Sequence, residues 1–241
     1  MKWSNISGYP VATNICEQEL REIEKQDGWS MAHVRMLPSA SSLLHFHKHM
    51  TEIYVMTRGR GKLVLDNKHC EIQPSDIALV SPDTHHMLKN LNDELSPALE
   101  HLVFAVPPFN PTDVHVVVGK KPRRLFYNVL PAPNIEDAFD GAKIMPYHFP
   151  HIDLSFAYGW VYNDQERRNP PHYHKKTREW IYVVSGRGMV ELNGVTWPIR
   201  ERDWVEIVPG EEHAFRNQQA APLTIVCVCS PRFDPSDVYY R

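Results

Sequence analysis

The chain has 241 residues, of which 42% are hydrophobic and 23% charged, and its net charge is −3 with histidine neutral. This length and composition are typical of a globular protein with a sizeable core and one or two domains. The weak net charge gives no electrostatic reason to expect nucleic acid or a membrane as a partner, and no apolar run approaches the roughly 20 residues of a membrane-spanning helix. We therefore expect neither partner.

The elements that the sequence predicts are mostly strands. CEQELREIEKQ, from Cys16, predicts a helix, and NIEDAFD, from Asn134, is a weaker helix candidate. Between them come short β-rich runs such as EIYVMT, KLVLD, DIALVS and HLVFAV, separated by Gly, Pro, Asp and Asn. Short strands at close spacing, with turn signals between them, predict an all-β sandwich or barrel. The proline-rich residues 107–150 predict a linker on the surface.

An internal repeat defines the domain organisation. HFHKHMTEIYVMTRGRG, residues 45–61, recurs as HYHKKTREWIYVVSGRG, residues 172–188, and the same offset of 127 residues relates Asp76, Pro82, His86 and Asn90 to later counterparts. Further along, PPFNPTDVH from Pro107 matches PRFDPSDVY from Pro231 at an offset of 124. Such self-similarity indicates a tandem duplication. We expect domains of residues 1–118 and 119–241.

The cysteines indicate the compartment. Cys16, Cys70, Cys227 and Cys229 form no CxxC pair and are too sparse for a disulfide scaffold. The N-terminal residues lack the apolar core of a signal peptide, so we expect a cytoplasmic protein. Cys227 and Cys229 would share one face of a strand, where small buried hydrophobic side chains are the simplest interpretation.

Two motifs occur complete in both copies. H-x-H-x4-E-x6-G describes residues 45–59 and 172–186, and proline or glycine followed by H-x3-N describes SPDTHHMLKN and VPGEEHAFRN. The chain thus resembles the cupin superfamily, specifically a bicupin. The resemblance implies an all-β fold of two tandem jelly-roll β-barrels with few short helices. Asp83 replaces the glycine that Gly210 supplies in the second copy, and Asp tolerates left-handed backbone better than most residues.

The resemblance also implies two sets of metal ligands, each with three histidines and one glutamate. They are His45, His47, Glu52 and His86 in the first domain, and His172, His174, Glu179 and His213 in the second. The H-x3-N motif selects His86 rather than His85. Such nitrogen and oxygen ligands suit Fe, Mn, Ni, Co, Cu or Zn. We expect one divalent transition metal per domain, with iron as the first choice.

The alternation of side chains along strands predicts which residues lie near each metal. They are Tyr54, Met56 and Leu88 in the first domain, and Ile181, Val183 and Phe215 in the second. Most of these are barrel core by default. Tyr54 is the catalytic candidate, because a phenol can donate to a bound oxyanion or relay a proton, and it makes the first domain the better candidate for catalysis.

The function that we expect is a metal-dependent enzyme acting on a small organic molecule, in the first place a non-haem Fe(II)-type dioxygenase. One alternative is a metal-assisted isomerase, lyase or decarboxylase without redox chemistry, and another is a non-enzymatic bicupin that binds a small ligand or sugar. The glycines of RGRG and SGRGM close hairpins rather than opening helices, which argues against a nucleotide site. Association into a homo-oligomer is left open.

Overall fold

The computed structural model describes residues 2–14, 18–118, 128–129, 133–138, 142–149, 151–163 and 170–240. Within these ranges the regular structure consists of strands and three short 3-10 turns, without an α-helix. None of the described segments is therefore a helix long and apolar enough to cross a membrane. The predicted all-β class is confirmed.

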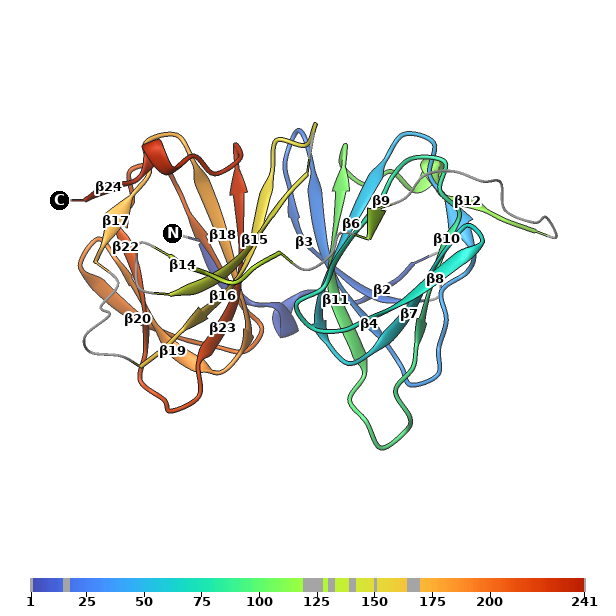
Figure 1. Cartoon of the computed structure of the whole chain (residues 1–241), viewed down its shortest axis with the longest axis horizontal. Coiled ribbons are helices and arrows are strands. Elements are labelled where there is room, and N and C mark those ends of the chain that lie inside the picture. Colours follow the sequence, from blue (N-terminus) through green and yellow to red (C-terminus); the bar gives the residue numbers. More distant parts are fainter. Residues whose placement is uncertain are drawn as a thin grey trace. The chain divides into compact units, whose positions relative to one another are not determined.

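The chain divides into two compact units. One, the first barrel, is Tyr9–Ala132, and the other, the second barrel, combines Met1–Gly8 with Pro133–Arg241. Each barrel is made of one seven-stranded and one five-stranded antiparallel sheet (Figure 1). This is the duplicated jelly-roll architecture that the repeat and the motifs predict.

The two sheets of the first barrel enclose an apolar core that includes Met36, Met56, Leu65 and Leu88. The seven-stranded sheet has the order β13 (Asn128–Val129), β9 (Ile77–Val80), β6 (Thr51–Arg58), β11 (Leu99–Val106), β4 (Ser30–Met36), β3 (Glu19–Lys25) and β2 (Ala12–Thr13). The five-stranded sheet has the order β12 (His115–Val116), β5 (His45–Phe46), β10 (His86–Asn90), β7 (Gly61–Leu65) and β8 (Lys68–Ile72). The turn η2 (Pro111–Asp113) precedes β12.

The second barrel repeats this plan around a core that includes Val183, Val190, Val205 and Leu223. The seven-stranded sheet has the order β1 (Lys2–Asn5), β21 (Asp203–Ile207), β18 (Arg178–Ser185), β23 (Leu223–Ser230), β16 (Ser155–Val161), β15 (Lys143–His148) and β14 (Glu136–Asp137). The five-stranded sheet has the order β20 (Val195–Arg200), β19 (Arg187–Leu192), β22 (His213–Asn217), β17 (His172–Tyr173) and β24 (Tyr239–Tyr240). The turns are η1 (Ile6–Gly8) and η3 (Pro235–Asp237).

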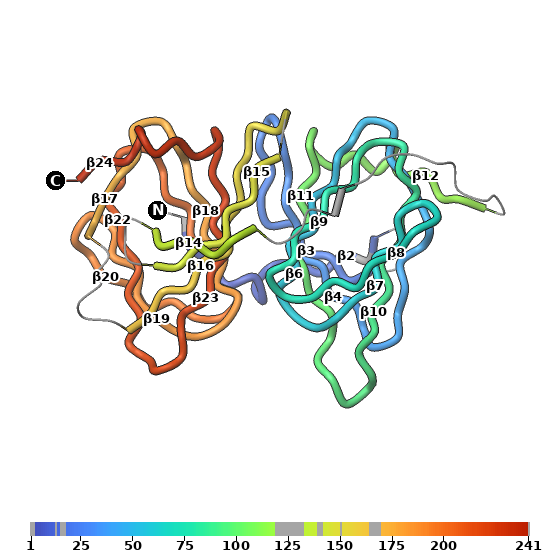
Figure 2. Tube along the Cα trace, in the orientation of Figure 1, coloured from blue at the N-terminus to red at the C-terminus, as the bar shows by residue number. Residues whose placement is uncertain are grey.

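The N-terminal strand β1 completes the sheet of the second barrel (Figure 2). It pairs with β21 from Lys2 opposite Glu206 to Asn5 opposite Asp203, and the Asn5 Nδ2 donates to Asp203 Oδ1 over 2.6 Å. The units therefore differ from the predicted domains of residues 1–118 and 119–241. A pairing between strands so far apart in sequence leaves no trace in the local pattern.

Both predicted helices are wrong over their described residues. Glu19–Lys25 is strand β3, which pairs with β4, and Glu136–Asp137 is strand β14, which pairs with β15. The charged sequence of β3 favours a helix in isolation, but its pairing along β4 and the burial of Ile23 decide the outcome. Cys16 lies outside the described residues.

The glycine turns connect sheets rather than close hairpins. Strand β6 belongs to the seven-stranded sheet and β7 to the five-stranded sheet, so Gly59 turns the chain from one sheet into the other with a φ of 77°. Gly186 does the same in the second barrel with a φ of 90°. Asp83 has a φ of 62° where Gly210 has 86°, which confirms that Asp83 occupies the left-handed region.

Candidate metal centres

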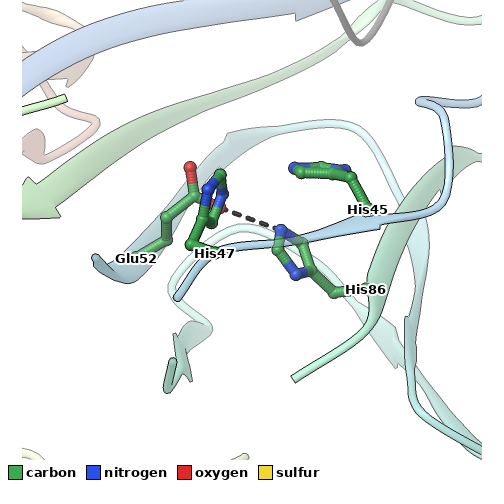
Figure 3. A group of neighbouring side chains, drawn as sticks. All are labelled: His45, His47, Glu52 and His86. Carbon is green, nitrogen blue, oxygen red and sulfur yellow. Dashed lines mark hydrogen bonds and ion pairs between the residues drawn. The ribbon is translucent and has the colours of Figure 1, made fainter. Parts of the chain in front are cut away.

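The first group of predicted ligands converges inside the first barrel. His45 begins β5, His47 follows it, Glu52 lies in β6 and His86 begins β10. Because β5 pairs with β10 with His45 opposite His86, the centroids of these two rings lie 4.1 Å apart. All four side chains are buried and point toward one another (Figure 3).

The distances within this group are those of a compact cluster. His86 Nε2 lies 3.0 Å and His47 Nε2 3.4 Å from Glu52 Oε2. One donor atom from each of the four residues lies within 4.8 Å of the others. His85, the neighbour of His86, is only half-buried and its ring packs on Phe46, so the choice of His86 from the H-x3-N motif places the right histidine in the cluster.

The imidazoles are oriented with Nε2 toward the centre. Nδ1 of His45 lies 2.9 Å from the carbonyl oxygen of Leu43, and Nδ1 of His47 and of His86 make the same contact with Asp113 and Thr84. Since a carbonyl oxygen only accepts, each Nδ1 carries the hydrogen and each ring turns its Nε2 toward the centre of the group. This orientation is the one that a metal ligand requires, and buried His47 Nε2 has no hydrogen-bond partner among the described residues.

Asp113 is a supporting residue that the sequence analysis did not assign. Its carboxylate accepts the backbone N–H groups of Lys48, His49 and Met50 over 2.9, 3.0 and 3.0 Å. It therefore fixes the loop that joins His47 to β6. The available signal was the repeat at an offset of 124, which matches Asp113 with Asp237.

The second group has the same geometry. His213 Nε2 lies 2.9 Å from Glu179 Oε2, and His174 Nε2 lies 3.5 Å from Glu179 Oε1. The rings of His172 and His213 are 4.3 Å apart, and Asp237 accepts the Nδ1 hydrogen of His174 on its carbonyl oxygen over 2.9 Å. The carboxylate of Asp237 accepts the backbone N–H groups of residues 175–177. Both barrels therefore hold a group of donor atoms that fits a metal ion.

The protonation states suit this interpretation. Burial, helped by the neighbouring His86, lowers the pKa of His45 to about 4, and burial with His213 does the same for His172. Burial alone would raise the pKa of Glu52, but the imidazoles of His47 and His86 beside its carboxylate hold that pKa well below its usual range. At neutral pH, His45 is thus neutral and Glu52 ionised, which are the forms that bind metals.

The cavity beside the first group contains two further polar side chains. The Tyr54 hydroxyl donates to Glu52 Oε2 over 2.7 Å, and His101 in β11 packs its ring 5.1 Å from the Tyr54 ring. Both line a cavity of about 50 Å³ together with His45, His47 and Glu52. Met56 and Leu88, predicted to lie near the metal, instead pack in the barrel core outside the lining of this cavity.

His101 was not singled out by the sequence analysis. It is fully buried, neither of its ring nitrogens has a hydrogen-bond partner within the described part of the chain, and burial lowers its pKa to about 3. One feature of the sequence could have identified it: His101 begins the apolar run HLVFAV, and the second copy has Ile225 at the equivalent position, 124 residues later.

The cavity beside the second group is larger and mostly apolar. It measures about 130 Å³, and Ile181 and Phe215 line it beside His172, Glu179 and His213, whereas Val183 packs in the core. Cys227 and Cys229 of β23 also line it. The two thiols share one face of a strand, as predicted, but they border a cavity instead of serving only as buried hydrophobic side chains.

Comparisons with known proteins agree with this architecture. A family model described as a cupin domain matches residues 32–100 and 160–229, more than half of the chain. An uncharacterized protein of Methanocaldococcus jannaschii is 30% identical over 88 residues, which are 36% of this chain and 68% of that protein. A protein of Streptomyces cyaneus named polyketide synthase CurC is 44% identical over 60 residues, 25% of this chain and 39% of the other.

Solved structures extend the similarity to the whole fold. Oxalate decarboxylase from Bacillus subtilis, solved at pH 4.6, has a TM-score of 0.68 and 13% identity, with 97% of this chain and 77% of that chain covered. A structure of the same enzyme, from a study of its Mn(II) centres, has a TM-score of 0.68 and 14% identity, with 97% and 78% covered. At this level of identity the likeness concerns the fold alone.

Proposed function

Because the chain belongs to the cupin family, we propose that it is a metal-dependent enzyme that cleaves or isomerises a small organic acid without net oxidation, with its catalytic site in the first barrel. The observation that carries the proposal is the pairing of Tyr54 and His101 in the cavity of the first ligand group. Lyase, decarboxylase and isomerase reactions require a proton to be removed from, or delivered to, a substrate atom. Side chains that carry a proton beside the metal position, such as Tyr54 and His101, can carry out this proton transfer.

In this proposal His45, His47, Glu52 and His86 hold the divalent ion. A divalent ion bound there would supply a Lewis acid that stabilises negative charge on a substrate oxygen. Asp113 keeps His47 in place through the backbone of the following loop and through the carbonyl oxygen that accepts the His47 Nδ1 hydrogen.

Tyr54 and His101 are the side chains that donate a proton or a hydrogen bond to the substrate. The Tyr54 hydroxyl keeps a proton at the edge of the metal position, where it serves as a general acid. His101 is neutral at physiological pH, because burial holds its pKa near 3, so its ring N–H can donate a hydrogen bond to a substrate oxygen without adding a charge. A carboxylate or keto oxygen of the substrate fits both groups.

The size of the cavity limits the substrate. A cavity volume of about 10–15 Å³ holds one water molecule. The first cavity, at about 50 Å³, therefore accommodates only a few water-sized groups. We infer a substrate among the smallest organic acids, because this volume holds roughly three to five such groups and the carboxyl oxygens count among them.

Similarity in fold to oxalate decarboxylase supports the non-redox alternative over a dioxygenase. The Mn(II) centres named for that enzyme make manganese a candidate metal equal to iron. The free thiols of Cys70, Cys227 and Cys229 fit a reducing compartment, in agreement with the expected cytoplasmic location. Association into a homo-oligomer stays a prediction.

The test is turnover of small keto acids and dicarboxylic acids by full-length protein loaded with Mn(II) or Fe(II). We expect a product of cleavage or isomerisation at equal rates with and without oxygen. Tyr54→Phe should lower kcat by about 100-fold or more while the metal content stays unchanged, since general acid catalysis contributes about that much. His172→Ala, which removes a ligand from the second barrel only, is the matched control and should leave turnover in place. Loss of turnover in His172→Ala but not in His45→Ala would assign catalysis to the second barrel.

A dioxygenase is the second candidate, because three imidazoles and one carboxylate leave metal positions open for oxygen and substrate. Oxygen uptake that matches substrate consumption mole for mole would favour it. If ligands bind but neither reaction occurs, the non-enzymatic alternative of a small-ligand or sugar-binding bicupin is the one left.

A further inference from the structure

Two cysteines lie directly beside the carboxylate of the second ligand group. Cys229 Sγ is 3.4 Å and Cys227 Sγ 3.6 Å from Glu179 Oε1, and the two sulfur atoms are 3.7 Å apart. The other carboxylate oxygen, Oε2, faces His213 over 2.9 Å. Glu179 therefore stands between an imidazole group and a sulfur group.

These three distances match one face of a tetrahedral metal site. Two sulfur atoms, each about 2.3 Å from a zinc ion, lie about 3.8 Å apart in a tetrahedron. A sulfur and a carboxylate oxygen, at about 2.3 and 2.1 Å from the ion, lie about 3.6 Å apart. The observed edges between Cys227, Cys229 and Glu179 are 3.7, 3.6 and 3.4 Å, so an ion could enter with little movement of the three atoms.

The first barrel shows that these sulfur atoms are not required by the fold. At an offset of 124, the first barrel has Val103 and Ala105 in β11, where the second has Cys227 and Cys229 in β23. All four side chains line the cavity of their own barrel. The thiols are therefore a chemical difference between two otherwise equivalent positions, and they face the space that an ion would enter.

We propose that Cys227, Cys229 and Glu179 form a second cation position in the second barrel, selective for a thiophilic divalent ion of the Zn(II) class. Thiolate ligands favour such ions over Mn(II), and three protein ligands leave the fourth position open to the cavity. Glu179 would be shared between this position and the three-histidine group. The inference goes beyond the proposed function, which concerns the first barrel.

The test uses Cd(II) as the probe, on full-length protein in which Cys16 and Cys70 are replaced by serine. The protein is first loaded with Mn(II), which occupies the imidazole groups, and Cd(II) is then titrated while the ultraviolet sulfur-to-metal charge-transfer band is recorded. We expect the band to saturate at one equivalent of Cd(II). The Cys227→Val/Cys229→Ala variant, which installs the residues of the first barrel, should lose the band and still bind two equivalents of Mn(II).

Single Cys227→Ser and Cys229→Ser variants cover the case in which the double variant does not fold, and each should weaken Cd(II) binding at least tenfold. Absence of the band from protein that binds Mn(II) normally would overturn the inference, because the thiols would then be only S–H donors to Glu179. Persistence of the band in the double variant would overturn it as well. Neither result bears on the proposed function, which concerns the first barrel. Failure of the first barrel to bind Mn(II) would count against the proposed function and leave the inference about the second barrel unaffected.

Discussion

At the scale of single residues, His101 shows how one substitution between duplicated copies changes a cavity. The second barrel fills the equivalent position with Ile225, a side chain that needs no hydrogen bond. The first barrel instead buries an imidazole completely, and both of its nitrogens lack partners among the described residues. A buried polar group without a partner destabilises the fold, so its presence beside Tyr54 indicates a role in function.

His101 also makes the stability of the metal-free protein depend on pH. Its pKa is about 3 in the folded chain and about 6.5 when unfolded, so between these values only the unfolded chain takes up the proton. The contribution of His101 to the free energy of unfolding is constant above about pH 6.5, decreases as the pH falls from about 6.5 to about 3, and is constant again below about pH 3. Each pH unit in this window costs about 1.4 kcal/mol for one such group.

We therefore expect His101→Ile to be more stable than the wild type at pH 5 and to show a flatter pH dependence, by about one proton. Urea unfolding of the metal-free protein between pH 7 and pH 4 measures both effects. His69→Ile, at an exposed histidine, should leave the slope unchanged. An unchanged slope in His101→Ile would mean that folded His101 takes up a proton in this range.

At the scale of elements, the loop between β5 and β6 holds His47 through Asp113, and its counterpart in the second barrel does the same through Asp237. The two acids are far from their loops in sequence, yet each carboxylate accepts three consecutive backbone N–H groups. The geometry of each ligand group therefore depends on one residue that need not touch the metal.

Asp113→Asn should weaken Mn(II) binding in the first barrel by about 10–100-fold, the usual effect of changing a residue that orients a ligand. The reason is that the amide replaces an ionised acceptor of three N–H groups. Isothermal titration of Mn(II) should then resolve one weakened and one normal site. Asp237→Asn is the matched control, with the weakened site in the second barrel, and equal affinities in both variants and wild type would contradict the role.

The strands and the ligand groups were predictable wherever the information was local. The motif residues, the left-handed Asp83 and the shared face of Cys227 and Cys229 follow from spacing and from the repeat. Strand β3 was not predictable, because its sequence favours a helix and only its pairing with β4 makes it a strand. The structure was also needed to show that His101 has no partner, since that depends on the packing of several strands.

At the scale of the whole molecule, the second barrel depends on a strand from the other end of the chain. Lys2–Asn5 pairs with β21 along its full length, and Ile6 is buried just after it. Without β1, the backbone edge of β21 would be exposed, and exposed edges promote aggregation.

Deletion of Lys2–Asn5 should therefore lower the thermal stability of the second barrel and promote aggregation, and leave Mn(II) binding by the first barrel intact. Calorimetry with and without Mn(II), together with light scattering, measures these effects. A peptide of residues 1–8 added to the deletion variant should restore stability, increasingly with the logarithm of its concentration, because it would pair with the free edge. If the deletion leaves both transitions unchanged, β1 contributes nothing to the second barrel.

The position of β1 also sets an order of events on the ribosome. Asn5 is made 198 residues before Asp203, to which it hydrogen-bonds. Every strand of the first barrel lies within Tyr9–Ala132, so that half of the nascent chain can close while β1 still waits for its partner. A chain arrested shortly before Asp203 would thus present a first barrel with all its strands made and a leading strand without its partner, and β1 could pair only once β21 had been made.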